Sequence, residues 1–116
     1  MASFEKFFID WLSSELGRAV GFVMIEDSVS ATLEDRTEIT PWHEELSFSV
    51  DCFFDAKGQA DAALSAAHAA IKKLPAQHPV VLSARLSAES IESAGTPRVW
   101  IYSGIFTLRV HTQEEY

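Results

Sequence analysis

The stretch Leu46-Ser47-Phe48-Ser49-Val50-Asp51-Cys52-Phe53-Phe54 alternates between two kinds of side chain at almost every step. A two-residue period is typical of an antiparallel strand with one face in a core and the other toward water. The apolar face is predicted to consist of Leu46, Phe48, Val50, Cys52 and Phe54. Because Cys52 lies on that face, we interpret it as a small buried hydrophobe rather than a reactive thiol.

An alanine-rich helix is predicted after this strand, over residues 59–74, with residues 55–58 as a tight exit from the strand. Its buried stripe is expected to be Ala60, Ala63, Leu64, Ala67, Ala70, Ile71 and Leu74. Such small side chains let a helix lie close to a sheet. We expect Lys72 and Lys73 in the last turn, and Pro75 to end the helix.

A first helix is predicted near the N-terminus, capped by Ser3 and ended by Gly17 in the left-handed conformation. Its apolar residues recur at helical spacing: Phe4, Phe7, Phe8, Trp11, Leu12 and Leu16. Residues 19–25 and 28–34 are predicted to form two strands or one bent strand. Residues 34–43 are polar and contain Pro41, which favours a long loop.

The last third of the chain is predicted to be a hairpin, with strands over residues 80–88 and 99–110 and a turn at 93–97. Gly104 is expected to mark a bulge where the inward face changes parity. The whole order predicts a single α+β domain over residues 1–116. Its mainly antiparallel sheet is packed by two helices, in the order α-β-β-β-α-β-β.

Charge and composition exclude several classes of function. Nine basic residues against seventeen acidic ones give a formal net charge of −8, which disfavours specific binding to DNA or RNA. Apolar stretches are interrupted within a few residues, so we expect no membrane span and no signal peptide. The lone Cys52 has no internal disulfide partner, as is common in a reducing cytosol.

Negative charge gathers in one part of the sequence, where Arg36 is the only basic residue. The acidic members are Glu26, Asp27, Glu34, Asp35, Glu38, Glu44 and Glu45. The simpler interpretation is a solvated loop or strand face. The alternative is a surface that repels anions or meets a basic partner. Trp42 lies within this stretch, directly after Pro41, and an exposed indole there is a candidate interface anchor.

No pattern in the sequence favours catalysis. Asp61, Ser65, His68 and Lys72 share one stripe of the second helix, but a polar stripe is what an amphipathic helix requires. His43-Glu44-Glu45 lacks the spacing of a metal site, and no GxGxxG, P-loop or GxSxG motif is present. We therefore expect no catalytic residue, no metal ligand and no cofactor.

The order of elements carries a resemblance to a known family. A strand through His43-Glu44-Glu45-Leu46-Ser47-Phe48 leads into the alanine-rich helix, and Arg85-Leu86-Ser87-Ala88-Glu89-Ser90-Ile91 follows. The chain closes with Tyr102-Ser103-Gly104-Ile105-Phe106-Thr107-Leu108-Arg109-Val110-His111. Over nearly its whole length it resembles the tail terminator, or tail completion, proteins of long-tailed bacteriophages and prophages.

That resemblance implies a subunit of a homo-oligomeric ring, typically a hexamer, which caps the tail tube and joins it to head-completion proteins. It places the protein in the host cytoplasm during assembly and in the virion tail afterwards. DNA must pass such a ring without sticking, so the acidic stretch is the candidate lumen or subunit contact. The alternatives are a small-ligand module or enzyme with a deep pocket, and an adaptor that offers an edge strand or the acidic stretch to a basic partner.

Overall fold

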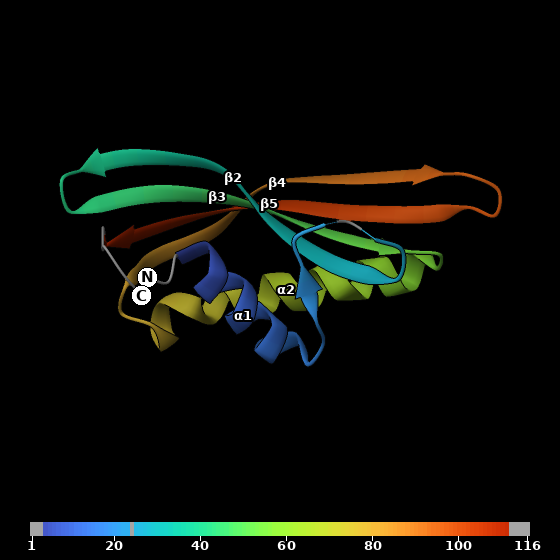
Figure 1. Ribbon diagram of the computed structural model, residues 1–116, viewed down its shortest axis with the longest axis horizontal. Helices are drawn as coiled ribbons and strands as arrows, with labels where there is room; N and C mark the ends of the chain where they lie inside the picture. Colours follow the sequence, from blue (N-terminus) through green and yellow to red (C-terminus); the bar gives the residue numbers. More distant parts are fainter. Residues whose placement is uncertain (1–3, 24, 112–116) are drawn as a thin grey trace.

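The computed structural model describes residues 4–23 and 25–111, and its fold is the expected α+β arrangement. The elements are α1 (Phe4–Leu16), β1 (Val20–Gly21), β2 (Ser28–Thr40), β3 (His43–Phe54), α2 (Lys57–Gln77), β4 (Val81–Ala94) and β5 (Val99–His111). The strands form one sheet in the order β1-β2-β3-β5-β4. All pairs are antiparallel except β1 with β2. Both helices lie against the same face (Figure 1).

The core lies between that face and the helices, and β3 and β5 supply its centre. Leu46, Phe48 and Cys52 of β3 pair with Leu108, Phe106 and Tyr102 of β5, and all six side chains are buried. The ring of Phe8 from α1 stacks on Phe48 with 4.2 Å between centroids. The burial predicted for the apolar face of residues 46–54, Cys52 included, is confirmed.

Two long hairpins give the molecule an elongated shape of 49 × 24 × 24 Å. The β2–β3 hairpin and the β4–β5 hairpin run past the helices at opposite ends of the sheet (Figure 1). The turn of the second hairpin occupies residues 95–98, and both of its strands are longer than the sequence predicted. Helices α1 and α2 do not have the length and apolar character needed to cross a membrane.

The prediction of a loop over residues 34–43 is wrong. β2 continues to Thr40, and β3 starts at His43 after a two-residue turn at Pro41 and Trp42. β3 provides the reason, because it pairs with residues along the whole of this segment, from Asp35 opposite Ser47 to Thr40 opposite His43. Charged side chains are tolerated there, because an exposed sheet edge accommodates them.

The strand predicted over residues 19–25 is also largely wrong. Only Val20 and Gly21 pair with β2, and the apolar side chains of Phe22, Val23 and Ile25 are exposed. The helix before this segment ends as expected, with Gly17 at φ +65°. The proposed Ser3 cap lies outside the described residues.

α2 is longer than predicted, because Pro75 does not end it. The helix runs on to Gln77, and the N–H of His78 donates to the carbonyl oxygen of Leu74 at 3.0 Å. A proline inside a helix lacks the N–H for one backbone hydrogen bond. Only two residues of α2 follow Pro75, so little of the helix is affected. Lys72 and Lys73 therefore lie before the last turn rather than in it.

Gly104 does not mark a bulge. The pairing of β3 with β5 keeps its register through Val50 opposite Gly104, and Tyr102, Gly104 and Phe106 all lie on the buried side. The register shift lies instead in the neighbouring strand, between Leu86 and Ala88 of β4. The inward face of β5 thus keeps one parity, and the burial predicted for Phe106, Leu108 and Val110 is confirmed.

Candidate functional site

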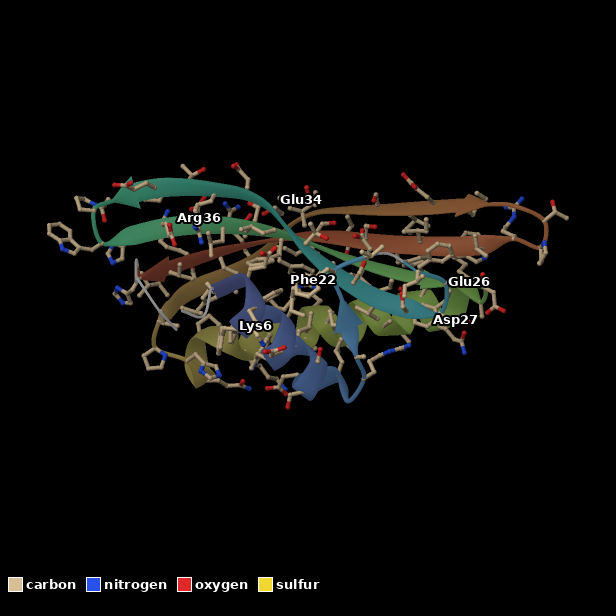
Figure 2. The ribbon with its side chains drawn as sticks, viewed as in Figure 1. Lys6, Phe22, Glu26, Asp27, Glu34 and Arg36 are labelled. Carbon is tan, nitrogen blue, oxygen red and sulfur yellow. The ribbon has the colours of Figure 1, made fainter. Side chains whose placement is uncertain are left out.

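The acidic residues singled out from the sequence are spread over β2, β3 and the turn before β2 rather than gathered into one patch. Glu26 and Asp27 lie in the turn before β2, whereas Glu34 lies midway along β2 and Glu38 near its far end. Figure 2 shows Glu26 and Asp27 far from Glu34, with Arg36 beyond it on the projecting hairpin. An extended strand rises about 3.3 Å per residue, so Glu38 is roughly 33 Å along β2 from Ser28, and Glu26 and Asp27 lie in the turn before Ser28.

Two of these carboxylates are held by cations. Glu44 lies 3.6 Å from the Arg36 Nε, and Glu45 accepts a hydrogen bond of 3.0 Å from the guanidinium of Arg109 on β5. Asp35 accepts from the backbone N–H of Arg36 at 2.8 Å. Among the described residues, no ion pair involves the exposed Glu34, Asp35 or Glu38. The negative potential of β2 therefore comes from these three side chains, and Glu26 and Asp27, which also form no ion pair with a described residue, add negative charge at the turn before β2.

Trp42 occupies the tip of the β2–β3 hairpin and is 71% exposed. The Thr40 hydroxyl shapes the turn: it accepts a hydrogen bond of 3.2 Å from the Trp42 N–H and lies 3.3 Å from the His43 Nδ1. Ile39, 43% exposed, and Pro41 extend the apolar surface of the tip. A large aromatic side chain on an ordered turn is a suitable anchor for a protein interface, because little conformational entropy is lost when it binds.

A groove of about 400 Å³ lies between α2 and β4. Its floor is apolar, since Ile71 and Phe106 are buried and Leu86 is half-buried, while Lys72 and Arg85 are exposed. The full lining is His68, Ile71, Lys72, Ala84, Arg85, Leu86 and Phe106. Neither Lys72 nor Arg85 forms an ion pair with any described residue. No pattern in the sequence predicted this groove, because it depends on how α2 packs against β4 in the folded sheet.

The sheet has open edges on both sides. β4 pairs only with β5, and β2 beyond Ser30 pairs only with β3 within the described part of the chain. Unpaired strand edges are sites where a further chain can add. The exposed apolar side chains of Phe22, Val23 and Ile25 add a further candidate contact.

The polar stripe of α2 does not form a catalytic triad. Asp61, Ser65 and His68 line a small pocket of about 100 Å³ with Tyr102, but no hydrogen bond joins any two of these three described residues. A working triad needs a base held by an acid and bonded to its nucleophile. This geometry fits better with the interpretation that these residues form the polar, solvent-facing stripe of an amphipathic helix.

Neither the cysteine nor the histidines form a reactive or metal-binding cluster in the described residues. No group of three His, Cys, Asp or Glu side chains there could hold a metal ion. Burial, with the nearby Asp51 carboxylate, raises the pKa of Cys52 to about 12, so its thiol stays protonated at neutral pH. His43 and His111 lie side by side at 5.0 Å across the β3–β5 pair.

No family model and no curated protein matches this sequence. The fold does match a solved structure, described as "Virion of native gene transfer agent (GTA) particle". The alignment covers 87% of this chain and 84% of the matched chain, with a TM-score of 0.63 and 17% sequence identity. The chain thus shares its fold with a chain of a gene transfer agent virion. At this identity, the likeness is one of fold.

Proposed function

We propose that this chain is a structural subunit of a phage-like particle, and specifically a tail terminator. It would form a ring, a hexamer in the usual arrangement of such proteins, on the end of the tail tube and join the tube to head-completion proteins. The observation that carries the proposal is the fold shared with a gene transfer agent virion chain over 87% of this sequence. The order of elements in the sequence resembles that of tail terminators, which also supports the proposal.

The surface supports assembly better than catalysis. Protein contacts commonly cover unpaired strand edges and exposed apolar side chains. This chain has both: open edges at β2 and β4, the indole of Trp42 at 71% exposure, and the exposed Phe22, Val23 and Ile25. A ligand-binding module would instead need a deep pocket between the sheet and the helices. Phe48, Leu64 and Phe106 fill the centre of that space with buried side chains, and the α2–β4 groove lies beside it, at the edge strand β4.

The proposed ring would have to let DNA pass. The exposed carboxylates of Glu34, Asp35 and Glu38 make one sheet edge anionic, and such a surface in a lumen would lower non-specific retention of phosphates. We accordingly propose the edge formed by β2 as the surface that faces the lumen or the next subunit. Assembly would take place in the cytoplasm of the host.

Deletion of the gene from a particle-producing strain tests the proposal. Without a terminator, tubes should grow to irregular lengths and stay unattached to heads, and expression of the chain in trans should restore joined particles. Electron microscopy of the lysate measures both the tube length and the fraction of joined heads. Joined particles with tubes of normal length in the deletion strain would overturn the proposal.

A further inference from the structure

The tip of the β2–β3 hairpin and the α2–β4 groove have matching chemistry. The tip presents an exposed indole beside Ile39, and the groove offers a buried apolar floor at Ile71 and Phe106. A volume of about 400 Å³ falls in the range of sites that enclose small ligands, roughly 300–1,000 Å³. The tip and the groove floor are therefore both apolar, and the groove has the volume of a site that encloses a small organic group.

The charges around the two features are opposite. Glu38 lies four residues before Trp42 on the same hairpin and forms no ion pair with a described residue. Lys72 and Arg85 flank the groove and are likewise free of ion pairs in the described chain. Opposite charges that are unpaired in the separate chains favour association and define its register.

The tip cannot occupy the groove of its own chain. His43, the residue after Trp42, is paired with His111 of β5, five residues along the strand from Phe106 in the groove. That separation is about 17 Å in an extended strand. The hairpin also points away from the body of the molecule (Figure 1). The occupant must therefore come from another molecule.

We propose that Trp42 of one copy of this chain binds in the α2–β4 groove of the next copy, with Glu38 of the first near Lys72 and Arg85 of the second. The contact is heterologous, since the hairpin and the groove are different surfaces. Repeating it produces a closed ring when the rotation closes, and a filament otherwise. The inference rests on the proposed ring and names the contact that holds the ring together.

Sedimentation velocity of variants tests the contact. Trp42→Ala should weaken self-association at least thirtyfold, which is the effect of removing a central aromatic anchor. A Lys72→Glu, Arg85→Glu double variant should weaken it similarly. Lys73→Glu is the matched control, because Lys73 is exposed on the same helix but does not line the groove. It should assemble like the unaltered chain.

Mixing the two defective variants gives a sharper result. The Trp42→Ala chain keeps an intact groove, and the double variant keeps an intact hairpin. The hairpin of the double variant can therefore bind the groove of the Trp42→Ala chain, whereas the reverse contact is lost. Two separately monomeric proteins should form a heterodimer that grows no further. Circular dichroism of each variant checks that these exposed substitutions leave the fold intact.

The outcomes separate this contact from the proposed function. A ring that persists in Trp42→Ala, or variants that fail to form the heterodimer, would overturn the contact while the tail terminator proposal stands. An unaltered chain that stays monomeric to millimolar concentration would overturn both the ring and the contact. A filament from the unaltered chain would support the contact and contradict a closed ring.

Discussion

At the scale of single residues, Gly104 of β5 lies where side chains from α2 and β4 pack against it. A Cβ atom there would lie 3.0 Å from the Phe106 Cε2 and 3.2 Å from the Cδ1 atoms of Leu64 and Leu86. Side chains of α2, β4 and β5 meet at this point. They occupy the space that a side chain at position 104 would need, so only glycine fits without displacing them. Backbone conformation does not explain this glycine, because Gly17 and Gly95 are the glycines with a positive φ angle and Gly104 is not one of them.

Gly104→Val should therefore destabilise the protein although valine favours strands. Overpacking of a close-packed core typically costs about 1–3 kcal/mol in the free energy of unfolding. Urea denaturation followed by fluorescence measures this change. Gly58→Ala is the control, because a Cβ at Gly58 meets nothing within 4 Å and alanine favours helix. Equal stability of Gly104→Val and the unaltered chain would contradict this account.

At the scale of elements, α1 is fastened to β1 by one side chain. The Ser13 hydroxyl donates to the carbonyl oxygen of Ile9 at 2.9 Å and accepts from the Val20 N–H at 3.0 Å. β1 has only two residues, so this bond supplements the pairing of Val20 with Val29 in holding its start in place. The exposed segment at Phe22 and Val23 follows directly, and its position depends on β1.

Ser13→Ala should lower the free energy of unfolding by about 0.5–1.5 kcal/mol, the net value of a typical hydrogen bond. The Val20 amide should also exchange with solvent faster, because its acceptor is lost. Hydrogen exchange followed by NMR measures the local effect. Ser14→Ala is the matched control, since Ser14 is exposed on the next position of α1. An unchanged Val20 exchange rate would show that β1 is held by other contacts.

The elements also show what the sequence could predict. Strict alternation located β3, and helical spacing located α1 and α2, because in each case burial follows the local period. Residues 34–40 were missed because their glutamates and the nearby Pro41 favour a loop, whereas pairing with β3 decides their conformation. Trp42 was predicted as an exposed anchor, and its exposure is confirmed. The groove could not be predicted, because no local pattern shows that α2 and β4 meet.

At the scale of the whole molecule, the net charge of −8 is distributed so that one sheet edge is anionic. Reversing Glu34 and Asp35 to lysine raises the net charge by four, from −8 to −4, and leaves Glu38, which belongs to the proposed subunit contact, unchanged. A cluster of lysines gains affinity for DNA by releasing condensed counterions, whatever the overall charge of the chain. The unaltered chain should not retain duplex DNA at about 0.1 M salt, and the clustered variant should retain it at low salt.

A second double variant separates the position of the charge from its amount. Asp61 on α2 and Glu92 on β4 are exposed, and reversing them to lysine gives the same net charge of −4. If the edge formed by β2 faces the DNA path in an assembled ring, only the clustered variant should bind DNA as a ring and slow its passage. Electrophoretic mobility shifts measured over a range of salt concentrations compare the two. Equal binding by both variants would mean that net charge alone matters, and the proposed lumen would lose its support.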